Sequence, residues 1–211
     1  MKSFILLLPL LALACTPAAE PQTVHDGQGR VRAQLERVAG KKEGIVRFLN
    51  SDGTLRTEGH YRADSRNGAW TTVGLTGDTL SLLQFIMGKK EGWQAYWSPN
   101  GQLLRMERFR DGEPDGPLYR FFSDGMPRQF TEYKEGIADG HYIEWYKSDS
   151  TAIGRTAGHF NQGKRSGLWH WTYGNGKPSY CGKYVNGERD GVWLKWSPEG
   201  KRTVTVFGSE K

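Results

Sequence analysis

The sequence predicts an all-β fold, an elongated ribbon of consecutive antiparallel β-hairpins. Three observations lead to this prediction. Glycine accounts for 28 of the 211 residues, or about 13%, against roughly 7% in an average protein. The 26 aromatic residues (8 Trp, 9 Tyr and 9 Phe) argue against disorder. The glycines also recur with a period of 24 residues, and glycine-rich turns between aromatic stretches are typical of short strands.

The first segment, residues 1–14, has the pattern of a secretory signal peptide. Lys2 is followed by an apolar run over residues 4–13. This run is about half as long as the roughly 20 residues that a membrane-spanning helix needs. We therefore expect residues 1–14 to direct export and not to form a permanent transmembrane segment.

The signal pattern ends at a candidate lipidation site. Residues 12–15, Ala-Leu-Ala-Cys, resemble the lipobox of bacterial lipoproteins, although Ala12 and Leu13 are exchanged relative to the preferred order. The resemblance implies that Cys15 is lipidated and becomes the mature N-terminus; the alternative is ordinary signal-peptidase cleavage nearby. Residues 16–23 (TPAAEPQT) are typical of a flexible tether, which we expect over residues 15–28. The protein would then be exported and anchored in the bacterial envelope, on its periplasmic or cell-surface side.

The repeat domain is predicted over residues 29–207. A Gly-x-x-x-Gly pair followed nine residues later by another glycine recurs along the chain, as in repeat architectures. Asp64 replaces the first glycine of one unit, and another unit has three extra residues near residues 148–154. A half repeat over residues 29–39 precedes seven units that start at residues 40, 64, 88, 112, 136, 163 and 187, and residues 208–211 form a tail.

Each unit predicts a strand, a turn, a second strand and another turn. Dipeptides such as Asp52-Gly53 and Asn100-Gly101 predict tight hairpin turns with positive φ at both residues. Residues 79–87 are apolar enough to form a helix, but their register with the other second strands favours a strand. The second strands end in an aromatic residue, at Tyr61, Phe85, Phe109, Tyr133, Phe160 and Tyr184.

The repeat resembles a known family. The pattern G-x-x-x-G-x-W-x-x-W/Y-x-x-x-G, with Tyr or Phe eight residues later, is similar to the MORN repeat, in the bacterial variant of YwqK antitoxin-like proteins. Gly68-Ala69-Trp70, Gly167-Leu168-Trp169 and Gly191-Val192-Trp193 fit it best. The chain departs from the pattern at Asp64, over residues 149–158, and at Phe207, which falls one place early. The resemblance implies a ribbon of hairpins, which agrees with the glycine spacing. Such a ribbon has no deep central pocket.

The motifs of catalysis and metal binding do not occur in this sequence. The five histidines lack metal-ligand spacing, and no nucleophile elbow or H-E-x-x-H helix is present. Residues 158–164 have phosphate-loop spacing, but Arg165 replaces the required serine or threonine. Cys181 has no disulfide partner once Cys15 is lipidated, and we expect it to be buried on a strand. The sequence therefore predicts no enzyme activity, metal or cofactor.

Two sets of residues are candidates for binding. One row of aromatic residues contains Trp70, Trp169 and Trp193, and the other contains Trp97, Phe121, Trp145 and Trp196. Because side chains alternate across a strand, the rows should lie on opposite faces. We expect the first row to form the core with the aromatic ends of the second strands, and the second to be partly exposed. The alternative is that bulging buries both rows. The other set is a basic row along one edge, Lys41, Lys42, Lys89, Lys90, Lys164 and Arg165, which could instead protect an exposed sheet edge.

Together these features predict a lipid-anchored envelope protein that binds another protein or an envelope polymer. The net charge of +6 favours anionic surfaces in general, and no nucleic-acid-binding motif is present. The family resemblance implies two alternative functions. The first is an antitoxin or immunity protein, which, if exported, would meet a toxin acting in the envelope. The second is direct binding of phospholipid, in addition to the membrane attachment expected from Cys15.

Overall fold

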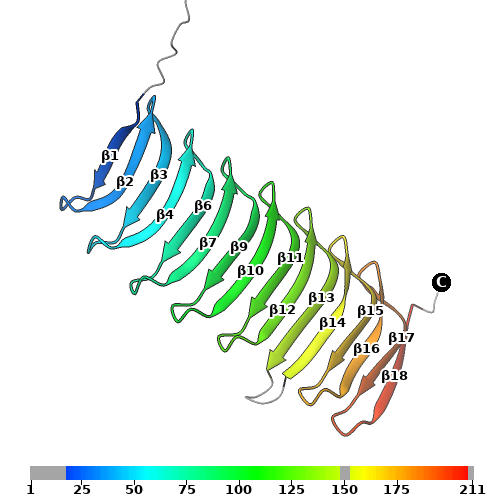
Figure 1. The fold of residues 1–211 in the computed structure, drawn as a ribbon. Coiled ribbons are helices and arrows are strands. Elements are labelled where there is room, and N and C mark those ends of the chain that lie inside the picture. Colours follow the sequence, from blue (N-terminus) through cyan, green and yellow to red (C-terminus); the bar gives the residue numbers. More distant parts are fainter. Residues whose placement is uncertain (1–17, 148–152, 209–211) are drawn as a thin grey trace, which may run out of the picture.

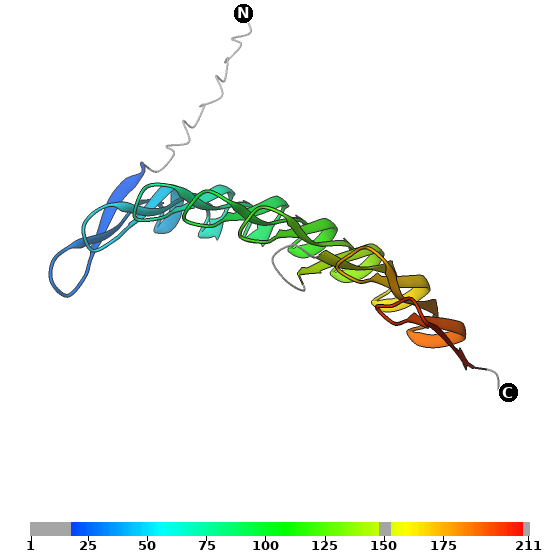
Figure 2. The same ribbon diagram turned by 90° about the horizontal axis from the view of Figure 1, so that it is seen from below.

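The computed structural model describes residues 18–147 and 153–208, which form one antiparallel sheet. Figure 1 shows the strands following one another in chain order, and Figure 2 shows a thin, long and bowed ribbon. The predicted all-β ribbon of hairpins is confirmed, and residues 79–87 form a strand as predicted. The strands are β1 (Glu20–His25), β2 (Val31–Val38), β3 (Lys41–Leu49), β4 (Leu55–Arg62), β5 (Ser65–Arg66), β6 (Gly68–Val73), β7 (Thr79–Ile86), β8 (Lys89–Lys90), β9 (Gly92–Trp97), β10 (Leu103–Arg110), β11 (Glu113–Phe121), β12 (Pro127–Lys134), β13 (Ile137–Lys147), β14 (Ile153–Asn161), β15 (Lys164–Thr172), β16 (Pro178–Val185), β17 (Glu188–Trp196) and β18 (Arg202–Phe207).

The two long edges of the ribbon carry different turns. At the upper edge in Figure 1, two-residue turns have positive φ at both positions, as at Ala39 (49°) and Gly40 (76°), which is the type I′ geometry. At the lower edge, the turn of residues 50–53 has positive φ only at Gly53, whose amide donates to the Asn50 carbonyl at 3.1 Å. The prediction of positive φ at both residues of Asp52-Gly53 was therefore wrong. These four-residue turns need a left-handed conformation only at the final glycine.

A glycine bulge interrupts the first strand of every unit. On β3, for example, Glu36 of β2 pairs with Glu43, whereas Gln34 pairs with Arg47, so β3 contains additional residues at this point. In two units the strand is divided here, which separates β5 from β6 and β8 from β9. Bulges of this kind bend a strand and increase its twist. The glycines with positive φ at these bulges are Gly44, Gly68, Gly92, Gly116, Gly140, Gly167 and Gly191.

Hydrogen bonds join successive turns along the upper edge. In every unit from the second on, the amide of the unit's first residue donates to the carbonyl of the third residue of the preceding unit. One such bond runs from Gly187 to Arg165 at 3.0 Å. Asp64 keeps this bond to Lys42, also at 3.0 Å, and its carboxylate accepts the Lys42 amide at 2.9 Å. Aspartate tolerates a φ of 65° better than most residues, so the departure from glycine is accommodated.

The core is a row of side chains on one face of the sheet, called here the packed face. These side chains come from the seventh position of each unit and pack against the aromatic residues that end the second strands. The ring centroid of Tyr184, for example, lies 5.9 Å from that of Trp169 and 5.0 Å from that of Trp193. The predicted core of these two aromatic series is confirmed. The seventh-position residues are Val46, Trp70, Gln94, Leu118, Tyr142, Trp169 and Trp193, of which only Tyr142 is half-buried and the others are buried.

Three tryptophans of this row lie over a glycine on the preceding strand. In each case the glycine is eleven residues earlier, and a Cβ built on it would lie 2.0–2.2 Å from the indole ring. Each indole Nε1 also donates to the carbonyl of the residue after that glycine, at 3.1–3.2 Å. The absence of a glycine side chain thus lets the ring approach the backbone closely. The pairs are Trp70 with Gly59, Trp169 with Gly158, and Trp193 with Gly182.

The sheet begins earlier than the repeat pattern predicts. Strand β1 pairs antiparallel with β2, so the tether predicted over residues 15–28 is wrong for Glu20–His25. All six side chains of β1 are exposed. This strand joins the sheet through its backbone and has no apolar pattern that marks it. The predicted signal peptide, Cys15, residues 148–152 of the segment predicted to contain three extra residues, and positions 209–211 of the tail lie outside the described residues.

Phe207 occupies the expected place although it comes one residue early in the sequence. It pairs with Gly191, just as Tyr184 pairs with Gly167. The β15–β16 pair has a register shift between Trp171 and Thr172, whereas the β17–β18 pair has none. The last hairpin therefore lacks one bulged residue, which accounts for the shift in sequence.

We expect Gly182→Ala to lower the free energy of unfolding by about 1–3 kcal/mol, because an overpacked core costs roughly this amount. The new methyl group would meet the Trp193 ring at 2.0 Å. Urea unfolding followed by tryptophan fluorescence measures the loss. Gly27→Ala is the control, since a Cβ there meets no atom within 4 Å, and a similar loss in both variants would contradict the explanation.

Candidate binding surface

The opposite side of the sheet, called here the open face, carries a mainly apolar column. It consists of the sixth residue of each unit, which directly precedes the core residue and therefore points the other way. The exposed fraction reaches 65% at Leu168 and 58% at Val192. Among the described residues no second layer covers this column. Its members are Ile45, Ala69, Trp93, Pro117, His141, Leu168 and Val192, and all except Pro117 are exposed.

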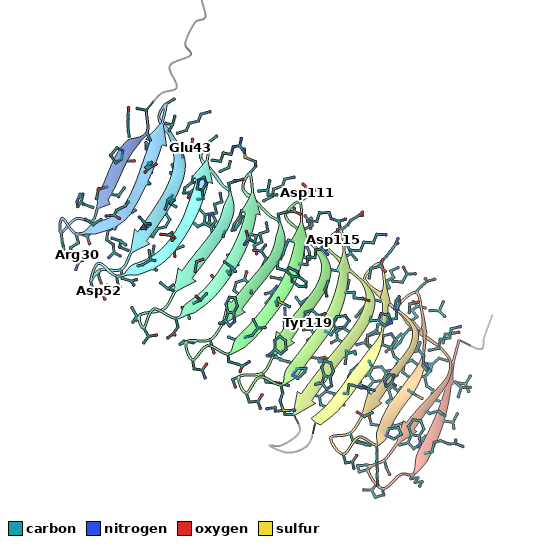
Figure 3. The ribbon with its side chains drawn as sticks, in the orientation of Figure 1. Arg30, Glu43, Asp52, Asp111, Asp115 and Tyr119 are labelled. Atoms are coloured by element: carbon teal, nitrogen blue, oxygen red, sulfur yellow. The ribbon has the colours of Figure 1, made fainter. Side chains whose placement is uncertain are left out.

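The predicted second aromatic row also lies on the open face. Trp97, Phe121, Trp145 and Trp196 are half-buried, so this row is partly exposed, as predicted. The β17–β18 register is regular from Gly191 to Trp196, so no bulge brings Trp196 to the side of Trp193. Tyr119, labelled in Figure 3, lies on the same face and packs against Phe130 with ring centroids 5.3 Å apart. The aromatic row and the apolar column thus share one surface.

The column itself was missed by the sequence reasoning. Its signal was the residue that follows each bulge glycine, such as Leu168 after Gly167 or Val192 after Gly191. Because side chains alternate along a strand, a residue that directly precedes a buried core residue points to the opposite face. The structure exposes it because all the tryptophans with a glycine beneath them lie on the other face.

The basic row predicted along one edge is divided between the two faces. Neighbouring residues of a strand point in opposite directions, so the members of this intermittent row do not share one surface. Lys42, Lys90 and Arg165 lie over rings of the packed face, with Arg165 Cζ 4.5 Å from the Trp169 ring centroid. The remaining members, Lys41, Lys89 and Lys164, are exposed, and Lys89 Nζ lies 3.5 Å from the Asp111 carboxylate.

Carboxylates along the edges hold turns. Glu43 accepts the amide of Ala63 at 2.8 Å, and the carboxylate of Asp115 lies 3.0 Å from the Arg110 guanidinium. Figure 3 shows Glu43, Asp111 and Asp115 at the upper edge and Arg30 and Asp52 at the lower edge. At the lower edge the Thr54 hydroxyl and amide both donate to Asp52 and hold the pKa of its carboxyl below the usual range. These carboxylates therefore stabilise the turns and strand ends along the two edges.

A small polar cluster lies midway along the open face. Glu132 Oε2 accepts the amide of His141 and lies 2.9 Å from its Nδ1. The amide hydrogen bond from His141 is the main cause that lowers the pKa of Glu132. The His141 and His159 rings are 5.5 Å apart. In residues 18–147 and 153–208, no group of three or more His, Cys, Asp or Glu side chains could hold a metal ion.

Cys181 and His170 face each other on β16 and β15. Cys181 is a free thiol and is half-buried, so its predicted full burial was wrong. In residues 18–147 and 153–208, no second layer covers the open face at this position. Burial, together with the positive charge of Arg155, lowers the pKa of His170, and Arg155 Nη2 lies 3.3 Å from His170 Nε2.

No family model matches this chain, and no curated protein matches it. The resemblance to the MORN repeat therefore stays a prediction. In the part of the chain that the structure describes, no helix has both the length and the apolar character needed to cross a membrane.

We expect His170 to titrate below its ordinary pKa of about 6.5. The folded chain favours the neutral imidazole, so the stability that this preference contributes is present above about pH 6.5 and is lost as the pH falls through the lower folded pKa. NMR titration of the imidazole signals measures the midpoint. Arg155→Gln should raise it, whereas Arg56→Gln on the distant β4 should not. A midpoint that is unchanged in Arg155→Gln would contradict the role of the arginine charge.

Proposed function

We propose that this chain is a lipid-anchored protein of the bacterial envelope whose open face binds another macromolecule. The exposed apolar column supports this proposal most strongly. It extends from Ile45 on β3 to Val192 on β17 and has the partly exposed aromatic row beside it. Exposed apolar side chains that recur along one face favour an interaction site, and repeat proteins commonly bind through extended surfaces.

The composition of the open face favours a protein as the partner. Residues of both charges pair directly with the column across the strands, as Arg108 does with Trp93, Glu132 with Pro117 and Lys183 with Leu168. Apolar anchors surrounded by polar groups of both signs are typical of protein interfaces. A surface for an anionic lipid alone would instead carry one sign of charge.

The proposed anchor would keep the first strand of the sheet close to the membrane. Cys15 precedes the start of β1 at Glu20 by five residues, which span at most about 18 Å when extended. Counting β5 with β6 and β8 with β9, the 18 strands form 16 rungs. Rungs about 4.8 Å apart give a ribbon of roughly 70 Å. The ribbon is thus several times longer than the tether, so a ribbon that stands away from the membrane would hold its later units well beyond the membrane surface.

We expect Cys15→Ala to release the protein from the membrane fraction or to stall its processing. Each buried methylene of a lipid chain contributes about 0.8 kcal/mol to membrane binding, so the several chains of a lipoprotein hold firmly. Fractionation of cells and immunoblotting measure the change. Cys181→Ala is the matched control and should stay in the membrane fraction. A correctly processed Cys15→Ala protein that stays there as well would contradict the anchor.

Crosslinking in intact cells followed by mass spectrometry should identify the partner. We expect the double variant Leu168→Lys and Val192→Lys to reduce capture of that partner by about tenfold or more, because two charges would replace apolar contacts at the interface. Both side chains are more than half exposed, so the melting temperature should change little. Undiminished capture by this variant would contradict the binding face.

A second pair of substitutions separates binding from stability. Trp97→Ala together with Trp145→Ala should weaken capture with a small loss of melting temperature. Trp169→Ala, in the core, should lower the free energy of unfolding by about 3–5 kcal/mol. A comparably large loss of stability for both rows would contradict an aromatic contribution to binding. Identification of a toxin as the captured protein would favour the antitoxin alternative.

A further inference from the structure

The packed face has a hollow near its C-terminal end. Tyr173, Ser179, Tyr180, Arg189 and Lys195 line it; Tyr173 follows β15, and the others lie on β16 and β17. Tyr180 and Lys195 are directly paired across the two strands. Arg189 Cζ lies 5.3 Å from the Tyr180 ring centroid. Two aromatic rings and two cations therefore surround one open space.

Aromatic stacking holds the guanidinium of Arg189 in place. Its Cζ lies 4.9 Å from the Trp193 ring centroid and 5.3 Å from that of Phe207. Tyr173 is also fixed, because its hydroxyl donates to the Trp196 carbonyl at 2.6 Å. The charged group and one wall of the hollow are thus ordered before any ligand binds, which reduces the entropy cost of binding.

The two cations of the hollow are not neutralised by the chain. Residues 153–208 contain three carboxylates, Glu188, Asp190 and Glu199. The first two flank Arg189 on β17 and so point to the open face, where Asp190 lies 3.9 Å from Lys183. Glu199 lies in the turn between β17 and β18. Among the described residues, neither Arg189 nor Lys195 forms an ion pair, which favours an anionic ligand at this point.

This arrangement is particular to the last unit. The equivalent residues of the preceding unit are Arg165 and Trp171, and Arg165 already donates to the Tyr184 hydroxyl at 2.9 Å. In the unit that starts at residue 136 the equivalent residues are Ala138 and Glu144. Packing of the repeat therefore does not require a cation at position 195.

We propose that this hollow binds an acidic sugar unit of a polysaccharide. A carboxylate of the sugar would lie between Arg189, which suits bidentate binding of a planar carboxylate, and Lys195. The apolar side of the sugar ring would lie on the Tyr180 ring, since tyrosine offers an apolar body with a polar tip. The hollow is open, so it can accept a unit within a longer chain. It lies on the packed face and does not depend on the proposed role of the open face.

Oligogalacturonate, with neutral dextran oligosaccharides for comparison, tests this site. A chain that starts at Thr16 contains the whole described sheet, because its strands lie within residues 20–207. Calorimetry should report binding of oligogalacturonate, and the tryptophan fluorescence should change because the Trp193 ring lies beneath Arg189. Binding should weaken as the salt concentration rises. Arg189→Gln and Lys195→Gln should each weaken it by about tenfold or more, the usual effect of losing a hydrogen bond to a charged group.

Lys183→Gln is the matched control, since it removes one positive charge from the open face of the same hairpin and should leave the affinity unchanged. Arg189→Gln also removes stacking on Trp193. Lys195 is exposed, so Lys195→Gln distinguishes loss of binding from loss of folding. Equal affinity of the original chain and Lys195→Gln, or equal binding of dextran, would overturn the proposal. Tighter, Lys195-dependent binding of inorganic phosphate or of anionic phospholipid vesicles would also overturn it and assign the hollow to a phosphate group.

Discussion

A sheet of one layer has no second layer against which to bury its apolar side chains, and most of this structure depends on how that constraint is met. Each core tryptophan lies over a glycine of the preceding strand, where even a Cβ would be too close. Its indole N–H finds a backbone carbonyl there, as from Trp193 to Lys183 at 3.2 Å, so the ring is buried without an unsatisfied donor. Gln94 takes the same place in the third unit and keeps the equivalent bond, to Gln84 at 3.1 Å.

Because the largest rings are buried on the packed face, the open face does not have to supply the core. Trp169 on the packed face is completely buried, while its neighbour Leu168 on the open face is among the most exposed apolar residues. The composition of the open face is therefore not dictated by packing, and this is the physical reason to look for a partner there. On the packed face, cations such as Arg165 and Arg189 lie over the core rings. The last unit adds a second cation, Lys195, which the packing of these rings does not require.

The conformation of the backbone at the turns and bulges is a second constraint on the sequence. Type I′ turns and bulges place residues at positive φ in every unit, and only glycine adopts this region without a steric cost. The turns then stack through hydrogen bonds from one unit to the next. Asp64 shows how a side chain can replace a glycine here, because its carboxylate adds a bond to the Lys42 amide. Contacts of this kind connect nearest neighbours only, as expected of a repeat protein.

The sequence by itself determined the repeat, the order of strands and turns, and the row that forms the core. Glycine positions and the alternation of side chains are local properties of the backbone, so they can be read one unit at a time. Only the tertiary structure decided the features that depend on the pairing of strands, namely the place of β1 in the sheet and the lining of the hollow. Strand β1 has neither a repeat glycine nor an apolar pattern, and only its backbone pairing with β2 places it in the sheet. Likewise, Tyr173, Tyr180 and Arg189 come from different segments of the chain, and the pairing of β15, β16 and β17 brings them around one hollow.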